Sequence, residues 1–267
     1  KAARLGLQRS DRLRHIRQIQ VRQGGEGFLG VLILLPLLHF FKARINAAAL
    51  DPAPAGSGSG QFAAGLALAR RAFRSGDIPV IGAADTFDFL GASAAMGHAS
   101  NAYDIDDGHN IIRAHPGTSF IGGLLAAGYA RDLNAQDFLA ALYVSYETTI
   151  RMGEAIMDYY QYAHSSGTFG AVGVAAGAGR IYGLDRAVLN NILSIAEFNA
   201  PLVPGIRSVE YPSMNKDGVP FGVMTGALAL LAGQSGFTGN KHLLEADEYR
   251  HYLDDLGRNH EVMALYF

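Results

Sequence analysis

The sequence predicts an all-α protein, a helical bundle whose central helices are rich in glycine and alanine. Apolar residues recur at helical spacing from Gln61 onward, and alternating strand patterns are nearly absent. The chain of 267 residues also combines 33 glycines with a hydrophobic content of 49%. Because glycine on an exposed helix only costs stability, Gly170, Gly173 and Gly177 indicate a helix that its neighbours pack closely.

Seven segments carry the helical pattern, and several have end signals of their own. Asp85 could cap the second segment, Pro116 suits the first turn of the third, and Gly183 would stop the fifth. In chain order, the predicted helices are Phe62–Phe73, Asp85–Tyr103, Pro116–Tyr129, Phe138–Met157, Gly167–Tyr182, Asp185–Phe198 and Gly222–Ala232.

The first sixty residues differ in composition from the rest. Residues 1–22 contain seven basic residues against one acidic residue, and the apolar run over 28–41 is interrupted by Pro36. That run is shorter than the roughly 20 residues that a membrane span needs. Residues 52–60 then read as a flexible linker of proline, glycine and serine. We therefore predict an atypical N-terminal segment with a linker over 1–60, and a helical domain over 61–267.

The composition excludes several classes of protein. The chain has no cysteine, which removes disulfide frameworks, thiolate zinc sites and cysteine-ligated iron–sulfur clusters. A cysteine-free chain fits a reducing compartment, and we expect a cytoplasmic protein. The formal net charge is −2 and the pI is about 6.5. We therefore expect neither a nucleic-acid partner nor a membrane.

The densest group of polar residues lies where one predicted helix ends and the next begins. Asp104, Asp106 and Asp107 fall within four residues, and His109 and His115 follow them closely. Three neighbouring carboxylates repel one another, so at least one needs a cation, a hydrogen-bond donor or a proton. Three interpretations stay open from these residues alone: a metal site, an acid/base site built on a histidine, and capping of the loop by short acids.

Two further groups could bind an anion. Ser166 and Thr168 open a glycine-rich helix just after His164, and a helix start offers free backbone N–H groups. From this stretch alone, ordinary capping by Ser165 or Ser166 is the better explanation. Lys216 lies in a polar loop and could hold a carboxylate or an enolate-like intermediate, although a loop lysine is usually just exposed.

Taken together, these segments resemble the MmgE/PrpD family, which includes 2-methylcitrate dehydratase, cis-aconitate decarboxylase and iminodisuccinate epimerase. The resemblance runs from about residue 65 to 267 and rests on the order of its motifs, which occupy residues 97–109, 115–117, 164–170, 216, 236–240 and 255–257. The acidic motif of the family typically reads Asp-x-Asp-Asp-Thr-His. Gly108 stands here in place of the threonine, so a hydroxyl that can contact the substrate is missing.

The resemblance implies a helical domain that bears most of the active site, with no metal and no organic cofactor, in a protein that forms a homodimer. The family also has a smaller α+β domain that follows the helical one. This chain stops about where that domain would begin, so we expect a truncated member that lacks it. By the same resemblance the catalytic residues are Asp104, His115, His164 and Lys216, and we expect substrate contacts from Asp107, His109, Ser166 and Thr168.

The activity that the resemblance implies is that of a lyase, a dehydratase or a decarboxylase, acting on a small di- or tricarboxylate. Two histidines would transfer protons, while a lysine and a helix N-terminus would bind carboxylates. An isomerase or epimerase could use the same proton transfer, and a truncated chain could also be a non-catalytic fragment. These alternatives stay open at this point.

Overall fold

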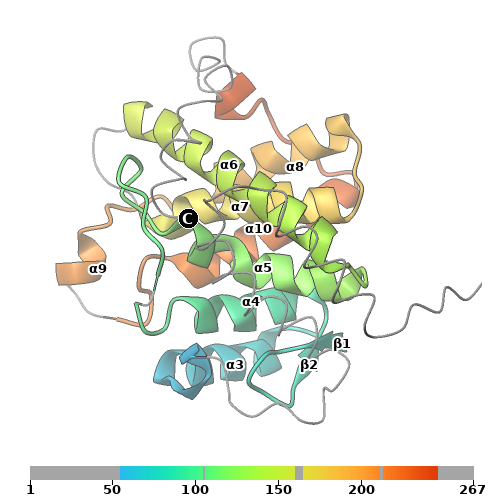
Figure 1. The fold of residues 1–267 in the computed structure, drawn as a ribbon, viewed down its shortest axis with the longest axis vertical. Helices are drawn as coiled ribbons and strands as arrows, with labels where there is room; N and C mark the ends of the chain where they lie inside the picture. The colour runs from blue at the N-terminus through green and yellow to red at the C-terminus, as the bar shows by residue number, and fades with distance from the viewer. Residues whose placement is uncertain (1–54, 105, 160–164, 211–212, 246–267) are drawn as a thin grey trace, which may run out of the picture. The chain divides into compact units, whose positions relative to one another are not determined.

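Seven helices of twelve or more residues build the part of the chain that the computed structural model describes, which is residues 55–104, 106–159, 165–210 and 213–245 (Figure 1). This confirms the predicted mostly helical fold. His164 and residues 1–54 of the predicted N-terminal segment lie outside the described residues. The helices are α3 (Gly60–Ala72), α4 (Phe89–Ser100), α5 (Pro116–Ala130), α6 (Ala135–Tyr159), α7 (Ser166–Ile181), α8 (Arg186–Asn199) and α10 (Val219–Gln234).

Short elements connect these helices. The 3-10 turns η2 (Ala55–Gly58) and η3 (Leu243–Glu245) lie before α3 and after α10, and α9 (Arg207–Glu210) is a single helical turn. The end of the predicted linker is thus a turn, and Ser59 caps α3 by accepting the N–H of Phe62 at 3.0 Å. None of the helices in the described ranges is both long and apolar enough to cross a membrane.

An antiparallel hairpin of β1 (Ser75–Pro79) and β2 (Thr86–Phe87) joins α3 to α4, with Pro79 opposite Thr86. The sequence did not predict it, because these strands are short and lack an alternating pattern. The expected cap of α4 is also wrong. Asp88 accepts the N–H of Gly91 at 2.8 Å and caps the helix. Asp85 instead forms an ion pair with Arg70.

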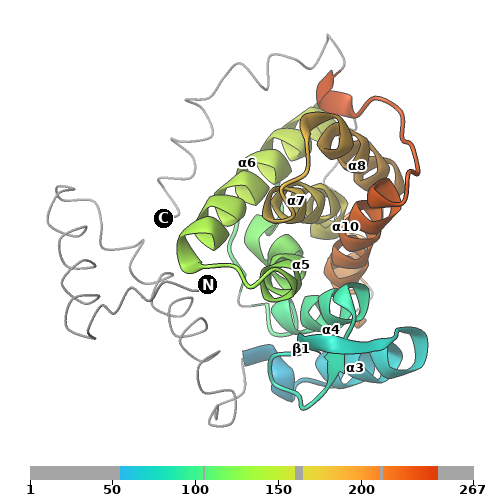
Figure 2. The ribbon, with the colours of Figure 1, turned by 90° about the vertical axis from the view of Figure 1, so that its right-hand side faces the viewer.

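Helix α7 lies at the centre, as its glycine and alanine content predicts. Figure 2 shows α5, α6, α8 and α10 around it, and every residue of α7 except Arg180 is buried. The glycines allow this close packing. A Cβ on Gly170 would lie 2.3 Å from the backbone oxygen of Ser119 on α5, and one on Gly173 would lie 2.2 Å from Oγ1 of Thr149 on α6.

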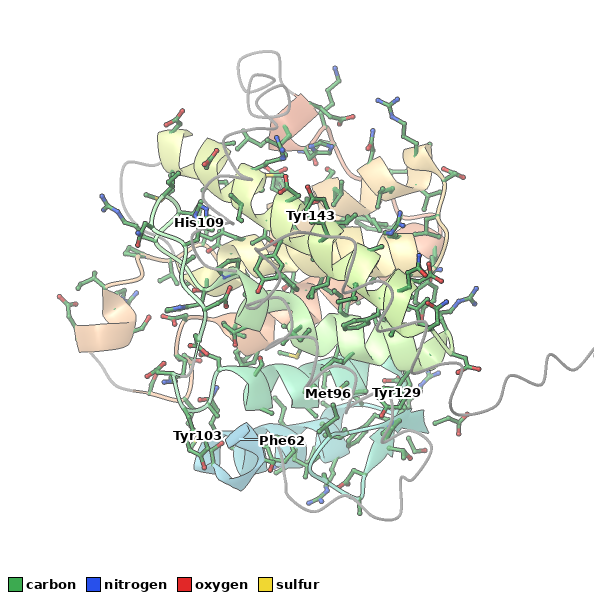
Figure 3. The ribbon with its side chains drawn as sticks, in the orientation of Figure 1. Phe62, Met96, Tyr103, His109, Tyr129 and Tyr143 are labelled. Carbon is green, nitrogen blue, oxygen red and sulfur yellow. The ribbon has the colours of Figure 1, made fainter. Side chains whose placement is uncertain are left out.

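Helices α3, α4 and α5 pack beside one another below this centre in Figure 1. Phe62 of α3 and Met96 of α4 are among the buried side chains of this layer (Figure 3). Close approach again depends on glycine, since a Cβ on Gly122 of α5 would meet the backbone nitrogen of Gly97 on α4 at 2.7 Å. The packing fixes the end of α4 against the start of α5, where the acidic motif lies.

Candidate active site

The loop that carries Lys216 is held against the first turn of α7. The N–H of Gly167 donates to the carbonyl of Asp217 at 2.9 Å. Only glycine fits at that contact, because a Cβ on Gly167 would lie 2.1 Å from the carbonyl oxygen of Gly218. Gly218 has a φ of 69°, the left-handed conformation that favours glycine, and it is the residue just before α10. The loop therefore has a fixed position at the start of the central helix.

The acidic motif between α4 and α5 reaches this loop. Nζ of Lys216 lies 2.6 Å from Oδ1 of Asp104, and the lysine side chain is 21% exposed while the aspartate side chain is 69% exposed. The fold thus brings together two of the predicted catalytic residues, which are far apart in the sequence. The ion pair leaves the ammonium at the edge of the site with one carboxylate beside it.

His115 occupies the position just before α5 and contacts three segments. Its N–H donates to Oγ of Ser166 at 3.0 Å, which links the starts of α5 and α7. Its Nδ1 lies 2.6 Å from the carbonyl oxygen of Asp107. Because a carbonyl can only accept, Nδ1 carries the proton, and Nε2 of the neutral ring is left able to accept one. Nε2 lies 3.8 Å from Oδ2 of Asp217.

A second carboxylate, that of Asp106, lies near the same imidazole. Burial raises the pKa of Asp106, while the nearby His115 and a hydrogen bond from Nδ2 of Asn101 at 2.6 Å oppose the rise. One side-chain atom from each of Asp106, His115 and Asp217 lies within 4.8 Å of the others. This geometry could hold a divalent cation, and it suits equally well a protonated imidazole between two carboxylates.

Asp107 has a different position from its two acidic neighbours. Its carboxylate accepts the N–H groups of Gly117 at 2.9 Å and Thr118 at 3.2 Å, in the first turn of α5, and the hydroxyl of Tyr146 at 3.2 Å. Burial, with the charge of Asp107, raises the pKa of Tyr146, so the phenol keeps the proton that it donates. In this structure the carboxylate of Asp107 accepts hydrogen bonds from free backbone N–H groups at the start of α5. Its contact with substrate stays a prediction.

The other predicted substrate-binding residues are buried and bonded within the chain. Oγ1 of Thr168 donates to the carbonyl of Pro201, and Ser166 accepts the N–H of His115. Nδ1 of His109 accepts the N–H of Ile112 at 3.4 Å, and burial lowers the pKa of the His109 ring, which Figure 3 labels. These contacts join the loops of the site, and direct contact with substrate stays a prediction for all three residues.

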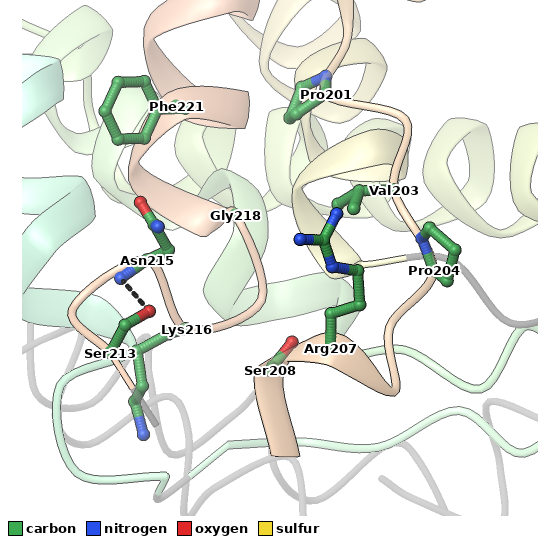
Figure 4. A pocket seen from close by; sticks show the side chains of 10 residues that line it. All are labelled: Pro201, Val203, Pro204, Arg207, Ser208, Ser213, Asn215, Lys216, Gly218 and Phe221. Carbon is green, nitrogen blue, oxygen red and sulfur yellow. Dashed lines mark hydrogen bonds between the residues drawn. The ribbon is translucent and has the colours of Figure 1, made fainter. Parts of the chain in front are cut away.

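A cavity of about 610 Å³ opens beside the loop of Lys216 (Figure 4). Among the residues that the structure describes, its lining contains two cationic residues, Arg207 and Lys216, and no carboxylate. Serine and asparagine side chains supply polar groups, and apolar side chains form the rest. The lining residues are Pro201, Val203, Pro204, Arg207, Ser208, Ser213, Asn215, Lys216, Gly218 and Phe221.

The fold and this site define a helical protein in which a histidine, a lysine and several aspartates meet beside a cationic cavity. Residues 51–253 match the MmgE/PrpD N-terminal domain family, so the chain belongs to that family. It is also 26% identical, over 165 residues, to a cis-aconitate decarboxylase-like protein of Aspergillus oryzae. The alignment covers 58% of this chain and 34% of that relative, so the matched part spans about a third of the relative's length.

Sequence reasoning assigned no separate roles to three residues of the site. Asp106 and Asp217 flank His115, and Arg207 lines the cavity. Asp217 directly follows Lys216, so a closer reading of that loop could have found it. Arg207 stands in no motif, and its position at the cavity depends on how the 201–207 connection folds back onto α7.

Proposed function

We propose that this chain carries the active site of a lyase that acts on a small di- or tricarboxylate without a cofactor and releases water or CO2. One observation carries the proposal: Lys216 lines a cationic cavity, while the next residue, Asp217, lies 3.8 Å from Nε2 of His115. This proximity supports a site in which His115 transfers a proton and Lys216 binds a carboxylate. Membership of a family that contains dehydratases and decarboxylases of carboxylates supports the same chemistry.

Both reactions pass through a state with extra negative charge. In dehydration, a base removes a proton from the carbon next to a carboxylate, and the hydroxyl group on the neighbouring carbon leaves as water when an acid protonates it. In decarboxylation, the bond to the leaving carboxylate breaks, its electron pair stays on carbon, and an acid then protonates that carbon. An ammonium beside the remaining carboxylate stabilises this enolate-like charge. We assign that role to Lys216.

His115 has the properties of the acid/base group. The carbonyl of Asp107 fixes the tautomer with the proton on Nδ1, so Nε2 is the atom that accepts a proton. Once Nε2 is protonated, the carboxylates of Asp106 and Asp217 stabilise the positive charge. The resemblance gives the second acid/base role to His164. Asp104 positions the ammonium of Lys216 through the ion pair.

The decisive experiment compares the purified protein with its H115N variant. Asparagine retains an N–H donor near the carbonyl of Asp107 but has no group in place of Nε2. We expect turnover of cis-aconitate or a citrate-like acid, followed by NMR, to fall by about 10²–10⁴-fold. The far-ultraviolet circular dichroism should stay unchanged. Pretreatment with a chelator should leave the turnover of the wild type unchanged.

Three outcomes would redirect the proposal. Incorporation of solvent deuterium into the acid, without loss of water or CO2, would indicate an isomerase or epimerase that uses the same proton transfer. Loss of turnover on chelation, with stoichiometric metal in elemental analysis, would indicate a metal site instead of a protonated imidazole. The metal ion would then lie between Asp106, His115 and Asp217. Equal turnover in wild type and H115N would refute the role of His115.

A further inference from the structure

A buried asparagine, Asn101, lies directly after the last residue of α4, and the proposed mechanism gives it no role. The residue is 0% exposed. Its Nδ2 donates to Oδ2 of Asp106 at 2.6 Å, whereas its Oδ1 is buried with no hydrogen-bond partner among the described residues. Burial of an amide is costly unless the group is hydrogen-bonded. The carboxylate of Asp106 is therefore the partner that accounts for a polar side chain at this position.

The residue before Asn101 fixes the end of α4 against the start of α5. Oγ of Ser100 donates to the carbonyl of Thr118 at 3.0 Å, and Oγ1 of Thr118 donates to the carbonyl of Ser100 at 2.7 Å. These two bonds join the last turn of one helix to the first turn of the other. Asn101 follows Ser100 and His115 directly precedes α5, so the amide has a fixed position relative to the histidine.

The carboxylate that Asn101 holds is one of the two beside the imidazole of His115. One side-chain atom from each of Asp106, His115 and Asp217 lies within 4.8 Å of the others. Burial raises the pKa of Asp106, while the charge of His115 and the hydrogen bond from Asn101 oppose that rise. An amide is uncharged and does not titrate. It can therefore hold the carboxylate in place without cancelling the negative charge that acts on the imidazole.

We infer that Asn101 is a positioning residue, which holds the carboxylate of Asp106 beside His115 so that this carboxylate stabilises the protonated imidazole. The inference rests on the proposed function, because it concerns the acid/base histidine of that site. Asn101 acts through Asp106 and has no direct part in binding the substrate. The positive charge on the imidazole develops as the proton is transferred, so loss of Asn101 should lower kcat and leave KM nearly unchanged.

Steady-state kinetics with a double-mutant cycle tests this role. N101L replaces the donor by an apolar branched side chain, and N101A removes it without adding bulk. Each should lower kcat at least about fivefold and change KM by less than about twofold. In the D106N background neither substitution should lower kcat further, because the charge through which Asn101 acts is already absent. Asn190 donates to Glu245 at 3.0 Å, so N190L is the matched control and should keep the kcat of the wild type.

A second measurement does not depend on turnover. NMR of protein labelled with ¹³C at the aspartate carboxyl groups follows the ionisation of Asp106, whose signal is the one missing from D106N. N101L should raise the pKa of Asp106, because the donor that favours the charged form is lost. N190L should leave this pKa as it is in the wild type. An asparagine that only ended α4 would not produce this difference between the two variants.

Each opposite result overturns the inference. An equal pKa of Asp106 in N101L and the wild type would show that the hydrogen bond does not control this carboxylate. A loss of kcat as large in the D106N background as in the wild type would show that Asn101 does not act through Asp106. A rise in KM alone would assign Asn101 to substrate binding. If the wild type turns over no acid, the proposed lyase activity fails, and the carboxyl titration still tests the contact between Asn101 and Asp106.

Discussion

Lys216 and Asp104 form a 2.6 Å ion pair in which both residues have a left-handed backbone, with φ values of 46° and 53°. Residues other than glycine adopt this conformation at a cost of order 1–3 kcal/mol each, and aspartate tolerates it better than lysine. Such a conformation persists where the surrounding structure fixes it. The contacts of the 213–218 loop with α7 fix the backbone of Lys216, whereas Asp104 lies in the segment between α4 and α5.

The D104N variant separates function from stability in this pair. Because Asp104 is 69% exposed, its ion pair should contribute less than about 1 kcal/mol to the free energy of unfolding. Loss of the carboxylate releases the ammonium from its position, so we expect kcat to fall at least about tenfold. Steady-state kinetics and a urea titration measure the two effects on one sample.

The second surface ion pair, between Asp85 and Arg70 at 2.8 Å, provides the control. D85N removes a comparable interaction from the connection between β1 and β2, so its stability should change about as little as that of D104N. Its kcat should equal that of the wild type. A D104N protein that retains full kcat would contradict the positioning role of Asp104.

Asp107, although only three residues from Asp104, should behave in the opposite way. Its carboxylate accepts two backbone N–H groups at the start of α5 and the hydroxyl of Tyr146. Removing the carboxylate leaves these donors unsatisfied, so we expect D107A to lower the free energy of unfolding by about 1–3 kcal/mol. Urea denaturation followed by circular dichroism checks this. A loss no larger than that of D104N would show that the cap contributes little.

The helices could be predicted from the sequence because their patterns are local. Helix α7 followed from its run of glycine and alanine, and its end followed from Gly183, which has a φ of 65°. The start of α4 could not be predicted in the same way. Asp85 and Asp88 both precede the apolar run, so either could be the N-cap by its place in the sequence. The ion pair that Asp85 forms with Arg70 is a tertiary contact, and Asp88 is the residue that caps the helix.

The site could be predicted in residue types but not in contacts. The motif around Asp104 and the loop of Lys216 each indicated function, and the fold joins them by an ion pair. No local pattern relates Arg207 to either motif, because its place depends on hydrogen bonds between α7 and the connection from Pro201 to Val203. Such long-range backbone contacts leave no periodic signal in the sequence.

Gly108 offers a test of the one departure from the family motif. A Cβ at this position would find nothing within 4 Å, and the glycine does not have a positive φ, so a side chain fits there without strain. We expect G108T to fold with unchanged stability and to lower the KM for a citrate-like acid, because it restores the hydroxyl that the family motif carries. G108A, which adds only the methyl group, should leave the KM unchanged. Equal KM values for G108T and G108A would show that the hydroxyl group does not contribute to substrate binding.

Stability should decrease as the pH falls below about 6.5, because three of the histidines in the described part of the chain are buried. Burial lowers the pKa values of His98, His109 and His242 from the ordinary 6.5. Below that pH the unfolded chain binds protons that the folded chain does not, so the free energy of unfolding falls until the pH passes the folded pKa values. Urea midpoints at pH 7.5 and pH 5.5 measure the effect, and the midpoint at pH 5.5 should be lower.

His98 allows this pH dependence to be assigned to one side chain. It lies against Gly65, where a Cβ would be 2.3 Å from its ring, and it makes an edge contact with Phe221 at a centroid distance of 6.5 Å. Both of its ring nitrogens are buried without a hydrogen-bond partner, so a proton placed there would have no acceptor. The H98L variant removes the group that titrates while it keeps an apolar side chain. Its midpoint should therefore fall less between pH 7.5 and pH 5.5 than that of the wild type, and an identical fall in both proteins would show that His98 does not contribute.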